Sequence, residues 1–264
     1  MAEVPLALQP VRSVGRSVLD MLRTAGGVAI FAGRGAIAAV SPPFFAGQFG
    51  RQLMSVGYFS LPVVGLTAVF TGAALALNIY TGGGRFNAEQ IMPQIVALGI
   101  TRELGPVLAA LMLAGRVSAA MAAEIGAMRA TEQIDALKTL STDPFRYLVA
   151  PRLLATVIVM PLLVVVADII GIAGGWVVAT KTLDFNGAVY VKNTWDFLQS
   201  WDVVSGLIKA AVFGFLLALM GCYHGYNSSG GARGVGRATT HAVVSAAILI
   251  FAADYILTAM FTHK

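Results

Sequence analysis

The chain has 264 residues, of which 57% are hydrophobic and only 12% are charged, and its mean hydropathy is +0.78. Ordinary soluble domains carry roughly 45–50% apolar and about 25% charged residues, so this composition excludes a water-soluble globule and indicates an integral membrane protein. The formal net charge of +5 is typical of the cytoplasmic loops of such a protein, so we expect no nucleic-acid partner. The single cysteine, Cys222, excludes an internal disulfide.

The first 60 residues predict an amphipathic helix followed by an elbow. On a helix, four charged residues share one face: Arg12, Arg16, Asp20 and Arg23. Apolar residues share another face, which is typical of a helix lying in the cytoplasmic interface. Pro42-Pro43 and the glycines at 47, 50 and 57 then indicate an elbow into the first span. The alternative is a cleaved signal peptide ending in the small residues 36–40, but Arg34 interrupts the apolar stretch before them.

Five apolar runs follow, each about 20 residues or more, which is enough to cross roughly 30 Å of hydrocarbon as a helix. They are Leu61–Tyr80, Met92–Gly115, Leu148–Thr180, Val203–Tyr223 and His241–Phe261. A β-barrel would instead show short alternating segments. The sequence therefore predicts an all-α integral membrane protein, with an N-terminal part (1–60) and a membrane domain (61–264).

Basic residues sort to one side of the five spans. Twelve Lys and Arg residues precede the first span or lie in the second-to-third and fourth-to-fifth connections, whereas the opposite side holds four: Arg85, Lys181, Lys192 and Lys264. The positive-inside rule then places the N-terminus in the cytoplasm and the C-terminus outside it.

Arg102 and Glu103 interrupt the second apolar run, and charged groups within a membrane are costly and usually functional. The uninterrupted part, Leu104–Gly115, has 12 residues and spans only about 18 Å as a helix. Either the span includes both charged residues, turned toward a protected interior, or the segment is a short hairpin arm. The two side chains could form an interfacial ion pair or face a substrate.

Lys209 lies six residues into the fourth run, among apolar neighbours. Its side chain could snorkel outward over a depth of about 9 Å. Alternatively, it could pair with a glutamate at similar depth on another helix, or bind an anionic head group.

The connection between the second and third runs, about 117–142, concentrates charge beside apolar residues spaced by three and four. Its charged residues are Glu124, Arg129, Glu132, Asp135 and Lys138. This pattern predicts one or two amphipathic helices that dock a soluble partner, or else a solvated loop that binds nothing. Asp143-Pro144 then predicts a helix cap and a helix start.

Catalytic motifs are largely absent, so we expect a non-enzymatic chain with no cofactor of its own. The three histidines are scattered, and neither His-Glu-x-x-His nor Gly-x-Ser-x-Gly occurs. The glycine-rich residues 230–236 lack the Gly-Lys-Ser/Thr ending of a phosphate loop and predict a flexible turn. The pairs Gly171/Gly175 and Gly221/Gly225 have the spacing of closely packed membrane helices and are compatible with a homodimer.

An ordered series of motifs from about residue 50 onward resembles the MlaE/YrbE-type permeases of ABC lipid transporters. The series comprises Arg102-Glu103-Leu104-Gly105-Pro106, Ala114-Gly115-Arg116, residues 123–137 (AEIGAMRATEQIDAL), Asp143-Pro144, Pro151-Arg152, Leu207-Ile208-Lys209, Gly225-Tyr226, residues 236–240 (GRATT) and residues 257–260 (LTAM).

The resemblance implies a homodimer in the bacterial inner membrane that moves phospholipid to or from a periplasmic MCE-domain carrier and contributes to outer-membrane lipid asymmetry. It also implies a cytosolic ABC ATPase, holding ATP and Mg²⁺, docked on a coupling helix that contains Glu124 to Leu137. It makes Glu103 and Lys209 candidates for the cavity or for lipid contact, with Arg102 beside Glu103, and places Asn78 and Tyr80 near the cavity. The alternative is an ATP-independent lipid-binding or scaffold protein.

Overall fold

The computed structural model describes residues 9–82 and 88–262, and within these ranges the chain is helical without a strand. The helices are α1 (Gln9–Val40), α2 (Ala46–Val56), α3 (Leu61–Gly82), α4 (Ala88–Gly99), α5 (Gly105–Leu113), α6 (Ala119–Ala130), α7 (Gln133–Thr139), α8 (Ala150–Lys181), α9 (Gly187–Phe197), α10 (Ser200–Tyr226) and α11 (Gly231–Thr262). Short 3₁₀ or π-helical turns join several of them: η2 (Tyr58–Ser60), η3 (Ile100–Leu104), η4 (Ala114–Ser118) and η5 (Phe145–Val149). The prediction of an all-α protein is confirmed.

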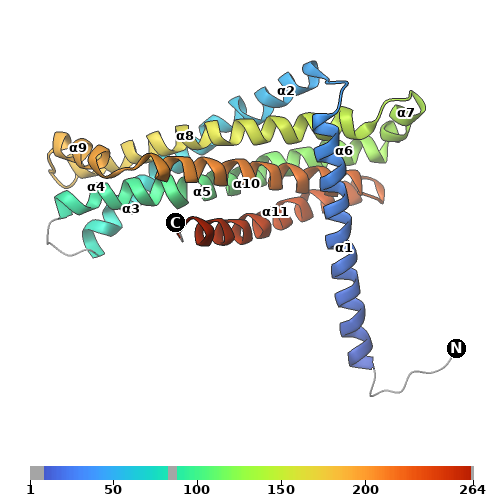
Figure 1. The fold of residues 1–264 in the computed structure, drawn as a ribbon, viewed down its shortest axis with the longest axis horizontal. Helices are drawn as coiled ribbons and strands as arrows, with labels where there is room; N and C mark the ends of the chain where they lie inside the picture. Colours follow the sequence, from blue (N-terminus) through green and yellow to red (C-terminus); the bar gives the residue numbers. More distant parts are fainter. Residues whose placement is uncertain (1–8, 83–87, 263–264) are drawn as a thin grey trace.

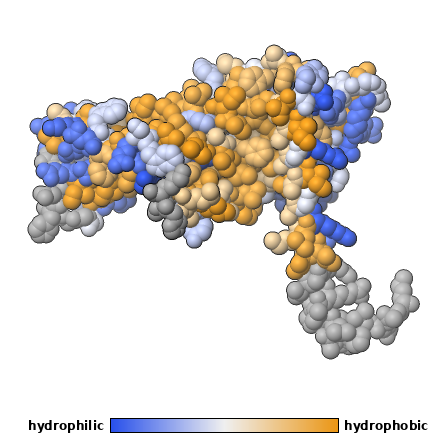
Figure 2. Space-filling view, viewed as in Figure 1, coloured by the Kyte–Doolittle hydropathy of each residue, from blue (hydrophilic) through white to orange (hydrophobic). Residues whose placement is uncertain are grey.

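Five helical stretches are long and apolar enough to cross a membrane, as the sequence predicted. They are Ala46–Gly82, Gln90–Ala130, Phe145–Lys181, Ser200–Tyr226 and Gly231–Phe261. They run along the long axis of the molecule (Figure 1), and the surface is apolar over the middle of the bundle and polar toward both ends (Figure 2). We call these ends the α7 end and the α9 end.

Helix α8 packs along α3 and α10, and α10 also packs on α6 and α11. Glycine permits the closest contacts, because a Cβ atom at Gly72 of α3 would overlap the carbonyl oxygen of Gly171 in α8. Gly221 and Gly225 likewise lie against backbone carbonyls of η4 and α6. The two small-residue pairs therefore pack helices within one chain, and they do not require a second copy.

Helix α1 leaves the bundle at the α7 end and runs roughly across its long axis (Figure 1). This is the orientation of a helix lying in the plane of the membrane, and its interfacial location stays a prediction. Phe31 anchors it on the bundle, with its ring centroid 4.9 Å from that of Phe145 and 5.5 Å from that of Tyr223. The side chains of Arg12 and Arg16 lie outside the described residues.

Two local expectations were wrong, and one helix was not anticipated. The elbow is confined to residues 41–45, because α2 includes Gly47 and Gly50 and packs along α8. The expected turn at 230–236 is shorter, since α11 begins at Gly231 and only Gly230 and Gly231 have positive φ angles there (89° and 64°). Helix α9 was not anticipated; the side chain of Asn186 caps it by accepting hydrogen bonds from two backbone amides.

The second span runs continuously through Arg102 and Glu103, so the hairpin-arm alternative is wrong. It also runs through Arg116, which the sequence placed in a loop. Arg116 donates hydrogen bonds to Ser60 Oγ (2.7 Å) and to the carbonyl oxygen of Ser55 (3.2 Å). These bonds attach the second span to the first and give the partly buried guanidinium partners within the protein.

Candidate functional site

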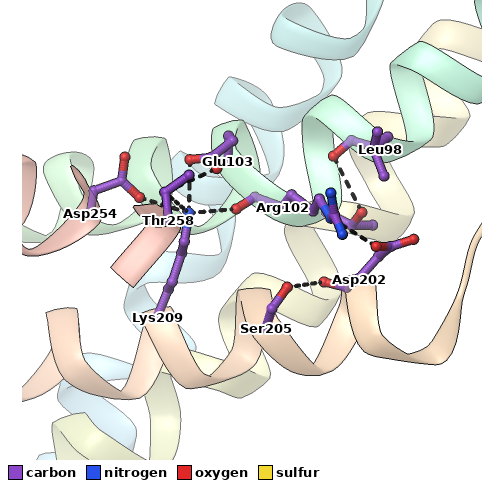
Figure 3. Close-up of polar contacts among 9 residues, drawn as sticks. Leu98, Arg102, Glu103, Asp202, Ser205, Lys209, Asp254 and Thr258 are labelled. Atoms are coloured by element: carbon purple, nitrogen blue, oxygen red, sulfur yellow. Dashed lines mark hydrogen bonds and ion pairs between the residues drawn. The ribbon is translucent and has the colours of Figure 1, made fainter. Parts of the chain in front are cut away.

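A cluster of charged and polar side chains lies between η3, α10 and α11 (Figure 3). We call it the polar cluster, and its members are Arg102, Glu103, Asp202, Ser205, Lys209, Asp254 and Thr258. Lys209 is nine residues after the start of α10, a depth of about 14 Å at the helical rise per residue. Lys209 is therefore far enough from the helix ends to require internal partners.

Lys209 is the centre of the polar cluster. Its Nζ lies 2.8 Å from Glu103 Oε2, 3.0 Å from Asp254 Oδ1, 2.7 Å from Thr258 Oγ1 and 3.0 Å from the carbonyl oxygen of Arg102. An ammonium group has three N–H donors, so these acceptors leave none for a ligand. Since its side chain is only 2% exposed, Lys209 does not snorkel, and the predicted pairing with a glutamate on another helix is confirmed.

Arg102 and Glu103 are adjacent but have different partners. Arg102 Nε lies 2.7 Å from Asp202 Oδ1, and the second carboxylate oxygen of Asp202 accepts the backbone N–H of Gln199 (3.0 Å), which caps α10. The two residues lie on the π-helical turn η3, where the i→i+4 bonding of the helix is interrupted, and the carbonyl oxygen of Arg102 accepts a hydrogen bond from Lys209 Nζ.

Arg102 and Glu103 are the members of the polar cluster whose charged side chains are most accessible from outside the cluster. Their side chains are 44% and 39% exposed, whereas those of Asp202 and Lys209 are 4% and 2% exposed. A cavity of about 70 Å³ is lined by these two residues together with Ser205, Lys209, Thr258 and Phe261. A ligand entering it would meet a guanidinium and a carboxylate that the buried residues hold in place.

Gly206 allows α10 to reach η3. A Cβ atom at this position would overlap the carbonyl oxygen of Thr101. The absence of a side chain therefore brings the backbones of α10 and η3 together and sets the separation across which Lys209 reaches Glu103.

Asn78 and Tyr80, the other predicted cavity residues, lie near the end of α3. Tyr80 makes an edge-on contact with Phe185 (ring centroids 5.9 Å apart), and Asn78 is exposed. Among the described contacts, neither residue joins the polar cluster.

The sequence reasoning missed Asp202, Asp254 and Thr258. Asp254 interrupts an apolar run as Lys209 does, so the same signal could have identified it. Asp202 falls one residue before the predicted span and was not considered. Thr258 lies within the motif at residues 257–260 that contributes to the resemblance, but a lone threonine is common in membrane helices and did not indicate a site.

The predicted coupling segment forms two helices, α6 and α7, separated by Thr131 and Glu132. Glu132 has a left-handed backbone (φ 59°), which turns the chain between them. Glu124 of α6 pairs with Arg152 of α8 (2.8 Å), a contact that fixes α6 to the bundle. The Phe145 amide donates to Asp143 Oδ1 (2.9 Å), so the predicted cap is confirmed.

Asp135 accepts from both Arg129 (3.1 Å) and Lys138 (2.8 Å) at the surface of α7. The hydrogen bond from Lys138 lowers the pKa of Asp135 below its usual 3.8, with the charges of Arg129 and Lys138 adding to the effect. The ionised carboxylate of Asp135 therefore contributes to the stability of the folded protein. This contribution is fully present at a pH above 3.8, the ordinary pKa of the group, and it is lost as the pH falls through the lowered pKa of the folded state.

The outer surface of α7 combines charge with an apolar residue. Buried Ile134 anchors the helix, while Glu132 is exposed and Leu140, which follows the helix, is 74% exposed. Among the residues that the structure describes, no group of three His, Cys, Asp or Glu side chains is placed to hold a metal ion.

Comparison with known proteins places this architecture among permeases. Residues 49–260 match the family described as Permease MlaE. A Rickettsia felis protein named "Probable ABC transporter permease protein" is 49% identical over 256 residues, covering 97% of this chain and 99% of its own length. The Haemophilus influenzae "Intermembrane phospholipid transport system permease protein MlaE" is 36% identical over 260 residues, covering 95% and 96%. The chloroplastic protein TRIGALACTOSYLDIACYLGLYCEROL 1 of Arabidopsis thaliana is 35% identical over 211 residues, covering 80% of this chain and 60% of its own.

Proposed function

Since this chain belongs to the MlaE permease family, we propose that it is the membrane subunit of an ATP-driven transporter that moves phospholipid between the bacterial inner membrane and a periplasmic MCE-domain carrier. The observation that carries the proposal is the polar cluster: a network of ion pairs inside an apolar bundle, with Glu103 and Arg102 lining a cavity. Such a group of charges in a membrane is costly and is usually retained for a function.

The geometry favours a division of roles within the polar cluster. Arg102 and Glu103 contact the phospholipid head group, because they are the half-exposed charges. Lys209 is a positioning residue, since it is buried and its donors are already bonded. Acyl chains then lie on the apolar side chains of the bundle.

A second copy of the chain would protect this charged cavity from the surrounding lipid. Helix α11 is mostly uncovered within one chain, since only 11% of its apolar, membrane-spanning stretch is buried. The exposed side chains of this helix form a stripe with spacings of three and four: Val244, Ile248, Phe251 and Tyr255. Because α11 also carries Asp254 and Thr258, a homodimer formed through this stripe would enclose the polar cluster.

The surface formed by Glu132 and Leu140 at the α7 end is the docking site for the cytosolic ATPase. It projects beyond the membrane-spanning part of the bundle (Figure 1) and combines an exposed charge with an exposed leucine. ATP and Mg²⁺ then bind the partner chain. Closure of that partner pushes on α6 and α7 and narrows the lipid cavity.

The test is a purification of the tagged chain from native membranes in mild detergent, followed by mass spectrometry of the proteins and lipids that co-elute. We expect an ABC ATPase, an MCE-domain protein and phospholipid. Lipid transfer to acceptor vesicles should then require ATP and fall in Glu103→Ala. A complex without any nucleotide-binding chain, whose lipid transfer is independent of ATP, would favour the scaffold alternative.

A further inference from the structure

Another polar cavity lies between α2 and the second span, toward the α7 end of the bundle (Figure 1). Its volume is about 100 Å³, compared with about 70 Å³ beside the polar cluster, and its polar lining comes from Gln52 and Ser55 of α2, Arg116 of η4 and Glu124 of α6. Arg116 follows Glu103 by 13 residues, which is about 20 Å of helix, so the two cavities are separate. We call this one the α2 cavity.

The α2 cavity lies at the level where the apolar surface of the bundle begins. Arg116 donates to Ser60 Oγ and to the carbonyl oxygen of Ser55, and the first apolar run starts directly after Ser60, at Leu61. In a bilayer the polar head groups lie at this boundary, next to the hydrocarbon core. The side chains of the α2 cavity can therefore meet the head groups of the leaflet at the α7 end.

Arg116 differs from its neighbours in having no carboxylate partner. Arg102 and Arg152, which also lie in membrane-spanning stretches, each pair with a carboxylate, at 2.7 and 2.8 Å. Among the residues that the structure describes, no carboxylate lies within ion-pair distance of Arg116. Both of its hydrogen bonds use Nη1, which leaves the three N–H groups of Nη2 and Nε without a partner in the same part of the chain. A guanidinium with this geometry can bind a phosphate through two parallel hydrogen bonds.

Glu124 adds an acceptor to the same cavity. Its Oε2 accepts a hydrogen bond from Arg152 (2.8 Å), whose side chain is 9% exposed, whereas the side chain of Glu124 is 55% exposed. Its second oxygen, Oε1, has no hydrogen-bond partner among the described residues. The α2 cavity therefore combines a guanidinium that lacks an anion with a fixed carboxylate that can accept a further donor, and this pair is complementary to a phosphate and an ammonium in one ligand.

Exposed apolar side chains adjoin this polar lining. Phe59 follows Ser55 by about one turn and Met112 precedes Arg116 by about one turn, so both lie further toward the middle of their spans. They are 58% and 39% exposed. The acyl chains of a lipid whose head group occupies the α2 cavity can lie on these two side chains.

We propose that the α2 cavity binds a phospholipid whose head group carries both a phosphate and a primary ammonium, such as phosphatidylethanolamine. The phosphate accepts from Nη2 and Nε of Arg116, and the ammonium donates to Oε1 of Glu124. A lipid held here lies in the leaflet at the α7 end, from which it could move to the polar cluster. That onward movement rests on the proposed transport function, whereas the binding does not.

Tryptophan fluorescence can provide a local readout. None of the three tryptophans, Trp176, Trp195 and Trp201, lines the α2 cavity, so each is replaced by phenylalanine. A single new tryptophan is introduced by Tyr58→Trp, because the ring of Tyr58 is exposed and lies 5.4 Å from that of Phe59. The probe is phosphatidylethanolamine brominated on its acyl chains, added to the delipidated full-length chain in detergent. Phosphatidylglycerol with the same brominated chains is the comparison, since its head group has a phosphate but no ammonium.

We expect saturable quenching by phosphatidylethanolamine, reversed by its unbrominated form, with an apparent affinity about tenfold above that for phosphatidylglycerol, the effect of one charge-assisted hydrogen bond. Arg116→Gln should weaken the binding of both lipids about tenfold. Arg51→Gln removes the same charge from an α2 residue that does not line the cavity and should leave both affinities unchanged. Glu124→Gln should remove the preference between the two lipids. Inorganic phosphate should not displace them, because it has no acyl chains.

Non-saturable quenching, equal affinity for the two lipids, or equal binding by the Arg116 and Arg51 variants would each overturn the proposal. Displacement of the lipid by an equal concentration of inorganic phosphate would also overturn it, by assigning a site for free anions. Circular dichroism and thermal unfolding of each variant identify any loss of affinity that is due to misfolding. If the Arg116 variant does not fold, the comparison of the two lipids still decides the outcome. The measurement needs neither ATP nor a partner chain, so its failure is independent of the proposed transport function.

Discussion

At the scale of single residues, Lys209 illustrates how a charge can be kept inside an apolar bundle. Removing an ammonium from water costs several kcal/mol unless carboxylates and further hydrogen bonds replace its hydration. Here two carboxylates, a hydroxyl and a backbone carbonyl do so. The same contacts fix the orientation of Glu103, so stability and site geometry depend on one nitrogen atom.

We predict that Lys209→Met destabilises the protein by about 2–3 kcal/mol, below the roughly 3–5 kcal/mol seen for fully buried pairs because Glu103 is half-exposed. The loss arises because Asp254 and Glu103 are left close together without a cation. Thermal unfolding in detergent measures it. Lys181→Met, which removes an exposed lysine at the end of α8, should change the unfolding temperature little. Equal effects of the two substitutions would show that the ion pairs of Lys209 contribute nothing.

At the scale of elements, the contact between α10 and η3 depends on the missing side chain of Gly206. We predict that Gly206→Ala costs about 1–3 kcal/mol, because the backbones must separate to admit a methyl group. The separation also lengthens the contact between Lys209 and Glu103. Both the stability of the protein and its rate of lipid transfer should therefore fall. The control is Gly236→Ala in α11, where a Cβ atom would meet nothing within 4 Å. That substitution should be neutral or stabilising, since alanine favours a helix.

Helix α7 is short and anchored by one buried residue, so its outer surface can be changed without disturbing the bundle. We predict that Glu132→Lys/Leu140→Asp abolishes co-purification of the ATPase while the unfolding temperature of the permease stays unchanged. Asp196→Lys on α9 reverses an exposed charge at the opposite end and should retain the ATPase. Undiminished co-purification in the α7 variant would refute the docking assignment.

At the scale of the whole molecule, the arrangement predicts which end faces the cytoplasm. Cys222 is completely buried, so the wild-type chain should react little with a membrane-impermeant maleimide. A cysteine at Thr182, at the α9 end, should be labelled in intact spheroplasts. One at Thr139, at the α7 end, should be labelled only after permeabilisation. The reverse pattern would invert the proposed topology and move the ATPase site to the α9 end.

Hydropathy alone predicted the number and nature of the spans, because twenty consecutive apolar residues have few alternatives to a membrane helix. Charge identified Arg102, Glu103 and Lys209, since charged residues are rare in such runs. It did not predict that the donors of Lys209 are saturated, because this depends on the angle and distance between three helices. The placement of Asn78 and Tyr80 near a lipid cavity came from the family resemblance rather than from spacing, and it stays a prediction; within one chain they lie near the end of α3, outside the polar cluster.

The net charge of the polar cluster links lipid transport to the membrane potential. Arg102 and Lys209 face three carboxylates, those of Glu103, Asp202 and Asp254, which leaves one uncompensated negative charge within the span. A unit charge moved across a whole membrane changes its energy by about 2.3 kcal/mol per 100 mV. A step that displaces the cluster along the membrane normal therefore makes lipid transfer depend on voltage. Proteoliposomes carrying potassium-diffusion potentials of opposite sign should transfer lipid at different rates, and equal rates would mean that the cluster stays fixed in the field.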